Sequence, residues 1–126
     1  MDYPQSDYGY IADLGLFFIP NIMRKESMIK ESKDNQVTLV ECGISDGHIT
    51  LKHHKTVSRD EFKAMQDNKP KEIRVIDEFG RVALPKVHLD ELKISPQDAL
   101  VTYLLNDGTI KIRPLVVSRT FASDAD

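Results

Sequence analysis

Apolar and polar residues alternate along the second half of the chain, which is the pattern of half-buried β-strands. The alternation predicts four strands, around Ile73–Val75, Val82–Leu84, Ala99–Leu105 and Thr109–Arg113. A turn is predicted over Asp77–Arg81, where Gly80 can adopt a positive φ that a side chain would resist. The chain from 73 onward is therefore expected to be mainly β.

A short helix and a hairpin complete this segment. Pro85 fixes φ at a value that suits the first turn of a helix, so Lys86–Lys93 is predicted to be helical and to end before Pro96. Asp107-Gly108 between two apolar runs is a strong hairpin signal. The resulting unit, Ile73–Pro114, is too short to bury its apolar faces well, which predicts that it pairs with a second unit.

The N-terminal half carries a diverged copy of the same pattern. Three pairs of residues share a spacing of 65 positions: Gly15 and Gly80, Pro20 and Pro85, and Ile29 and Ile94. Asp46-Gly47 also mirrors Asp107-Gly108. The alternative is chance, because turns reuse the same residues. The predicted organisation is an N-terminal copy over 1–65, a linker over 66–71, the C-terminal unit over 72–115 and a flexible tail over 116–126.

A second interpretation of residues 1–65 remains open. Val37–Met65 has the pattern of a strand pair followed by a helix, in which Ser58 and Glu61 form a capping box and Phe62 and Met65 provide an apolar side. This segment also resembles the multimerising half of AbrB-type regulators. Under that interpretation the N-terminal half is a multimerisation domain.

The C-terminal unit resembles the AbrB/SpoVT-like swapped-hairpin domain, which AbrB regulators, MazE-type antitoxins and MraZ proteins share. The resemblance covers about a third of the chain and is carried by Val75-Ile76, Asp77–Pro85, Leu92, Ile94, Asp98–Leu100 and Ile110–Ile112. It implies a mainly β fold with short helices, in which two strand-turn-strand-helix-hairpin units interlock into one swapped-hairpin β-barrel. The turn positions of the two units are Gly15, Pro20, Gly80, Pro85, Asp107 and Gly108.

The resemblance also implies a DNA-binding surface, which carries over only in part. Its residues would be Arg74, Arg81, Lys86 and His88. The arginine pair that AbrB carries after the Pro-led turn falls here at Leu89 and Asp90, and the N-terminal copy has Leu16 where Arg81 stands. Two structural alternatives stay open: Arg81 braces its turn against Asp77 or Glu78, and Arg74 joins a cross-strand ion pair.

The charge does not favour a nucleic acid. The chain carries a net charge of -3, and residues 71–115 contain seven basic and seven acidic side chains. Because phosphate contacts need lysine or arginine, DNA binding requires these few cations to gather on one face.

Other chemistry finds little support in the sequence. It has no Gly-rich phosphate loop and no nucleophile motif, and adjacent His53 and His54 on a strand would point to opposite faces. We therefore expect no enzymatic activity, no metal and no cofactor. The single Cys42 and the lack of a long apolar run indicate a cytoplasmic protein.

The expected function is a DNA-binding transcriptional regulator of the AbrB type that binds double-stranded DNA as a homodimer or higher oligomer. The alternative is a protein-interaction module with a reduced DNA surface, which antagonises or co-assembles with a related AbrB-type protein. Salt dependence of DNA binding separates the two, because only phosphate contacts release counterions.

Overall fold

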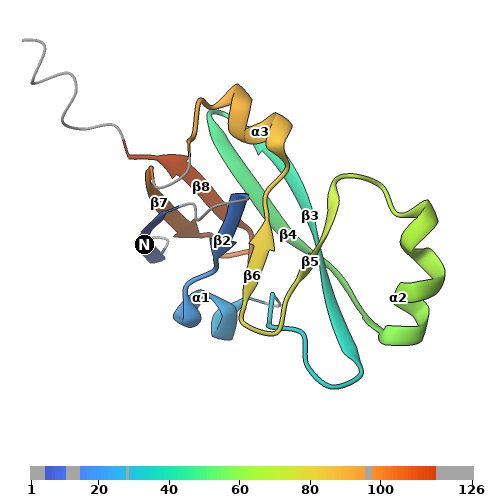
Figure 1. The fold of residues 1–126 in the computed structure, drawn as a ribbon. Coiled ribbons are helices and arrows are strands. Elements are labelled where there is room, and N and C mark those ends of the chain that lie inside the picture. The colour runs from blue at the N-terminus through green and yellow to red at the C-terminus, as the bar shows by residue number, and fades with distance from the viewer. Residues whose placement is uncertain (1–4, 11–14, 28, 96–97, 116–126) are drawn as a thin grey trace, which may run out of the picture.

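The computed structural model describes residues 5–10, 15–27, 29–95 and 98–115, with the backbone alone for 5–10. The expectation of a mainly β chain with short helices is confirmed (Figure 1). The elements are β1 (Gln5–Tyr10), β2 (Leu16–Phe18), α1 (Asn21–Glu26), β3 (Gln36–Ser45), β4 (His48–Ser58), α2 (Arg59–Met65), the 3₁₀ turn η2 (Gln66–Asn68), β5 (Ile73–Ile76), β6 (Arg81–Ala83), α3 (Lys86–Glu91), β7 (Ala99–Leu104) and β8 (Ile110–Pro114).

The strand pairs of the described residues are all antiparallel and form two sheets. The larger sheet has the order β1-β7-β8-β4-β3-β5, and β2 pairs with β6 in the smaller one. The expected closed barrel is wrong for the described residues, since neither sheet closes on itself. The sheets stay separate because β6, after the β5–β6 turn, pairs with β2 instead of extending the ladder of β5.

The strand pairing is symmetric with respect to the two halves of the chain. In this symmetry β1 corresponds to β5, β3 to β7 and β4 to β8. The pairing of β1 with β7 is therefore equivalent to that of β5 with β3, and the β3–β4 hairpin is equivalent to the β7–β8 hairpin. β2–β6 and β4–β8 each join equivalent strands, with Phe17 opposite Val82 and Thr50 opposite Lys111. The larger sheet therefore takes three strands from each half, and the two halves pair within one chain.

The same symmetry extends to single hydrogen bonds. Ile19 N–H donates to Gly80 O (3.0 Å), and Leu84 N–H donates to Gly15 O (3.1 Å). Both glycines have positive φ, +74° at Gly15 and +82° at Gly80, as the turn chemistry predicted for Gly80. Pro20 and Pro85 each stand immediately before a six-residue helix.

One core lies between the two sheets and holds apolar side chains of both halves. Its fully buried members include equivalent pairs such as Ile49 with Ile110 and Leu51 with Ile112. A second, smaller cluster fills the space under α2, where Phe62 and Met65 pack against Val37, Leu39, Val57 and Ile73. The predicted apolar side of this helix and its capping box are both present, with Glu61 N–H donating to Ser58 Oγ (3.1 Å).

The loop ends differ in detail from the expectation. α3 ends at Glu91 rather than at Lys93, because Lys93 adopts φ +56° and breaks the helical run. At the predicted hairpin, Asp107 accepts a hydrogen bond from Thr109 N–H (2.9 Å), and Gly108 has φ +88°. Pro96 and the 116–126 tail lie outside the described residues.

Candidate nucleic-acid interface

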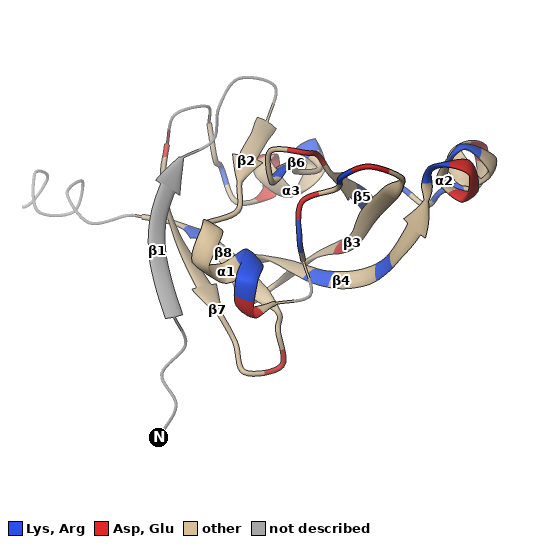
Figure 2. Cartoon of the chain, turned by 90° about the horizontal axis from the view of Figure 1, so that it is seen from below, with Lys and Arg blue, Asp and Glu red and all other residues tan. Residues whose placement is uncertain are grey.

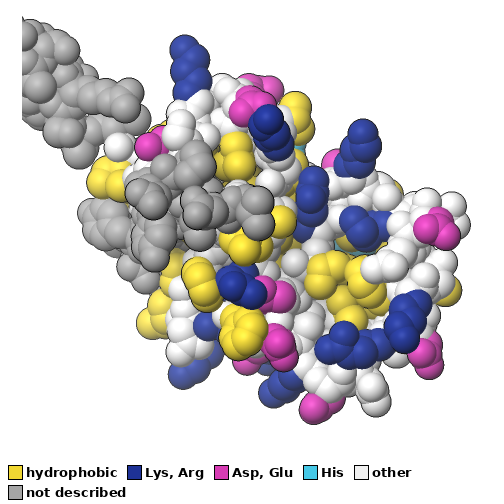
Figure 3. Space-filling view, viewed as in Figure 1, with side chains coloured by type: hydrophobic (Ala, Val, Ile, Leu, Met, Phe, Trp, Pro, Cys, Tyr) yellow, Lys and Arg dark blue, Asp and Glu magenta, His cyan; other side chains and the backbone are white. Residues whose placement is uncertain are grey.

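Three of the four residues predicted to contact DNA line one groove. It lies where the approach to β5 meets the start of α3, and its volume is about 450 Å³. Its lining consists of Lys71, Glu72, Arg74, Pro85, Lys86, Val87 and His88. Figure 3 shows dark-blue side chains along this face, between α3 and the segment that leads from α2 to β5. The groove thus has apolar surface at its proline and at the exposed Val87, and its charged side chains are mainly basic.

Strand pairing and the Pro-led helix start bring these residues together. Arg74 stands opposite Val40 in the β3–β5 ladder, which fixes the position of its strand. Buried Pro85 starts α3 and leaves Lys86 exposed on the first turn. Residues more than ten positions apart in the sequence therefore share one surface.

Arg74 keeps hydrogen-bonding capacity in the groove, whereas the unpartnered nitrogen of His88 is buried. Arg74 donates from Nε to Lys71 O (3.0 Å), which orients the guanidinium. Its cross-strand ion pair, the structural alternative, is not among the ion pairs of the described residues. His88 Nδ1 is buried and has no hydrogen-bond partner within the described part of the chain. An anionic group that enters the groove would meet the Arg74 guanidinium, whereas the buried Nδ1 of His88 is out of its reach.

Sequence reasoning missed Lys71 and the opposing Glu72 in this lining. Both residues lie just before a predicted strand, and no sequence motif identifies them as site residues. Only the tertiary contact with α3 reveals that Lys71 adds a cation and that Glu72 places a carboxylate beside it.

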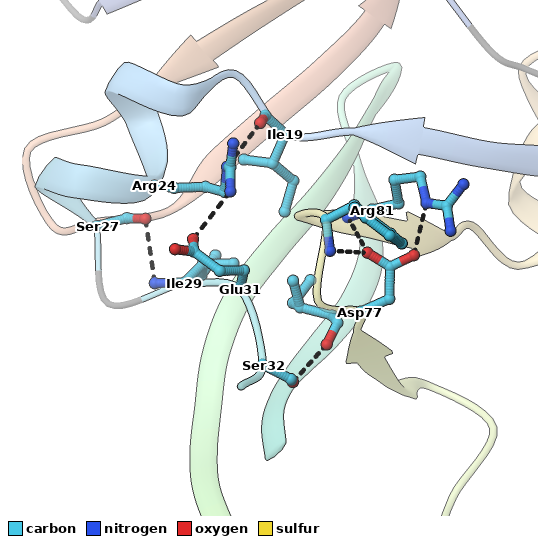
Figure 4. Close-up of polar contacts among 10 residues, drawn as sticks. Ile19, Arg24, Ser27, Ile29, Glu31, Ser32, Asp77 and Arg81 are labelled. Atoms are coloured by element: carbon cyan, nitrogen blue, oxygen red, sulfur yellow. Dashed lines mark hydrogen bonds and ion pairs between the residues drawn. The ribbon is translucent and has the colours of Figure 1, made fainter. Parts of the chain in front are cut away.

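Arg81 stands apart from this lining and is engaged in its own turn, as one structural alternative anticipated. Its Nε donates to Asp77 Oδ2 (2.6 Å), and Asp77 Oδ1 accepts from the backbone N–H of Phe79 (2.9 Å) and of Arg81 (2.8 Å). Figure 4 shows this arrangement. Partial burial acts to raise the pKa of Asp77, but the hydrogen bonds from Arg81 and Phe79 outweigh it and lower the pKa below its usual value.

Two phenyl rings flank the same guanidinium. The Cζ of Arg81 lies 5.6 Å from the ring centre of Phe18 and 5.0 Å from that of Phe79. These distances are typical of cation–π contacts. Both phenylalanine residues are more than half exposed, at 53% and 59%.

The equivalent surface of the N-terminal half lacks the cations. Given the symmetric pairing, Gly9 is the counterpart of Arg74, Asn21 of Lys86 and Met23 of His88. Figure 2 shows how the charged residues are distributed over the elements. Among the described residues, the basic groove therefore has no counterpart in the N-terminal half.

The remaining candidate chemistry is sparse. No group of three or more potential metal ligands gathers among the described residues, and none of their helices is long and apolar enough to cross a membrane. Burial raises the pKa of the Cys42 thiol to about 12, so this cysteine is a poor nucleophile. His53 lies at a shallow site with Lys52 and the Asp107–Thr109 turn.

Comparisons with known proteins give a likeness to a solved structure and no match by sequence. No family model matches the sequence, and no curated protein matches it. The solution structure of PHS018 from Pyrococcus horikoshii aligns with 91% of this chain and 92% of its own, at 16% identity and a TM-score of 0.38.

Proposed function

We propose that this chain is a DNA-binding regulator of the AbrB type, which binds double-stranded DNA through the basic groove and acts as a dimer or higher oligomer. The observation that carries the proposal is the convergence of Arg74, Lys86 and His88 on one groove together with Lys71. Gathering cations on one face is what a chain of net charge -3 needs in order to bind phosphates.

The symmetric pairing of the two halves supports the fold part of this proposal. In the resembled family, two strand-turn-strand-helix-hairpin units interlock. Here β2 and β6 pair between the halves, and so do β4 and β8. We interpret the chain as a pseudo-dimer of swapped-hairpin type that contains both units.

The groove is suited to the DNA backbone more than to base edges. Its size accommodates a phosphate and its sugar, and the exposed Val87 can contact the sugar. Arg74 has terminal amino groups left for phosphate oxygens, whereas Lys86 supplies a point charge. Because the described part of the N-terminal half has no such groove, symmetric binding to a palindrome requires two chains.

Salt titration of DNA binding tests the groove. Fluorescence anisotropy with a labelled duplex would give the affinity of the wild type, Arg74→Ala and Lys86→Ala over a range of salt concentrations. Each substitution should weaken binding and reduce the slope of log K against log salt by about 1, since each removes about one phosphate contact. Lys25→Ala, an exposed lysine on α1, is the matched control and should leave the slope unchanged.

The outcome also decides between the two candidate functions. Equal slopes for the groove variants and the control would contradict the groove as the DNA site. An absence of binding even at low salt would favour the interaction module, for which the exposed rings of Phe18 and Phe79 are the supporting observation.

A further inference from the structure

Two exposed phenyl rings stand on the surface away from the basic groove. Phe18 lies on β2 and Phe79 in the β5–β6 turn, and both flank Arg81. We call these three residues and the adjacent Glu78 the Phe18–Phe79 patch. Figure 3 shows yellow side chains beside both basic and acidic ones over α1 and the adjoining end of β6.

The patch is ordered by its own hydrogen bonds. Asp77 binds the backbone of Phe79 and both the backbone and side chain of Arg81, so the turn and the guanidinium are held in place. Gly80 is buried beneath the turn against the guanidinium of Arg24, which is itself paired with Glu31 (2.8 Å). A surface that is already ordered loses little entropy when a partner binds.

The patch contains one cationic and one anionic side chain that can each form further contacts with a partner. Among the side-chain donors of Arg81, Nε alone has a hydrogen-bond partner in the described part of the chain, and Figure 4 shows the outer amino groups directed away from Asp77. Glu78 is exposed and forms no ion pair with a described residue. A partner surface should therefore offer apolar area together with one cation and one anion.

We propose that the Phe18–Phe79 patch is a self-association surface whose occupant is the same patch of a second copy of this chain. Under a two-fold axis, Phe79 of one chain packs on Phe18 of the other, and the outer edge of Arg81 faces Glu78 across the interface. A two-fold interface must be self-complementary, and a patch with both signs of charge around apolar rings meets that requirement. Aromatic residues and arginine are also the residue types enriched in interface centres.

Nucleic acid is the less suitable occupant. Although exposed rings can stack on bases, Glu78 within the patch and Asp77 beside it are carboxylates, which would repel phosphates. The inference rests on the proposed function, in which this protein acts as a dimer or higher oligomer, and it identifies the surface through which two copies associate. DNA binding by the basic groove is a separate property and can be measured separately.

Molar mass as a function of protein concentration tests the inference. Light scattering after size exclusion, without DNA, would compare the wild type with Phe18→Ser, Phe79→Ser and Glu78→Arg. We expect a dimer whose dissociation constant rises about tenfold or more in each variant, because each removes apolar contact or places like charges opposite each other. Val87→Ser is the control, since Val87 is 66% exposed but lies in the basic groove, and it should dimerise like the wild type.

Three results would overturn the inference. These are a wild type that is monomeric at every concentration, a dimer that all patch variants leave intact, and an equal loss in the Val87→Ser control. Circular dichroism establishes that each variant is folded. Anisotropy with a short duplex keeps the two proposals apart, because patch variants should keep the affinity of a single chain for DNA, whereas Arg74→Ala should lose it and remain dimeric. A monomeric wild type whose DNA affinity falls in Phe79→Ser would assign the patch to nucleic acid instead.

Discussion

Gly80 is subject to two independent constraints that only glycine meets. Its φ of +82° is a conformation that side chains resist, and a Cβ at this position would lie 2.5 Å from the guanidinium carbon of Arg24. That guanidinium cannot move freely, because it donates to Ile19 O (3.1 Å) and to Glu31 (2.8 Å). The turn signal in the sequence identified the first constraint and contained no sign of the second.

Alanine substitution separates these two constraints. Gly108 has a similar φ of +88° but no atom within 4 Å of a Cβ, so Gly108→Ala should cost about 1–2 kcal/mol, from the backbone alone. Gly80→Ala should cost roughly 1–3 kcal/mol more, since it also displaces the partly buried guanidinium of Arg24 from its hydrogen bonds. Urea unfolding of both variants measures the difference. Equal losses would show that Arg24 moves aside without cost.

At the scale of elements, α3 ends in a Schellman motif that lacks its usual glycine. Lys93 N–H donates to Asp90 O (3.1 Å) and Ile94 N–H to Leu89 O (2.8 Å), while Lys93 has φ +56°. Leu89 and Ile94 both lie in the main core and provide the apolar contact of this motif. The predicted helix extended to Lys93 because lysine gives no stop signal, whereas glycine would have done so.

The same motif offers a stabilising substitution. Lys93→Gly should raise the free energy of unfolding by about 0.5–1 kcal/mol, because relief of the left-handed strain exceeds the added entropy of the unfolded chain. Lys93→Ala is the control for loss of the charge, and it should give no gain because it keeps the Cβ. Thermal or urea unfolding would measure both variants. A gain with alanine equal to that with glycine would attribute the effect to charge instead.

At the scale of the whole molecule, local signals predicted the elements better than their assembly. The sequence predicted the correct positions of the Asp-Gly turns, the capping box of α2 and the Pro-led helices. These features depend on residues that are close in the sequence. The separate β2–β6 sheet, the position of Lys71 in the groove and the stacking of Arg24 on Gly80 depend on contacts between distant segments. The sequence accordingly predicted Arg74, Lys86 and His88 as individual site residues. The other residues of the groove, and the location of Arg81 outside it, could be found only in the tertiary structure.

The interleaved strands predict how the chain behaves when it is cut between its halves. The larger sheet takes three strands from each half, so the 66–71 segment joins two parts that already share a sheet and a core. Separating them would expose fully buried pairs such as Leu51 and Ile112, at about 1.5–3 kcal/mol for each apolar side chain.

A protease site introduced at Asn68-Lys69 would test this expectation. After cleavage, the two fragments should elute together at the native volume in size exclusion and separate only in denaturant, because the shared sheet and core hold them together. Intact chain carrying the same site serves as the control, and the circular dichroism of both should agree. Separation of the fragments in native buffer would mean that the halves are stable domains joined by a linker. Co-elution would instead assign the shared sheet as the unit of stability, with the basic groove and the Phe18–Phe79 patch both built on it.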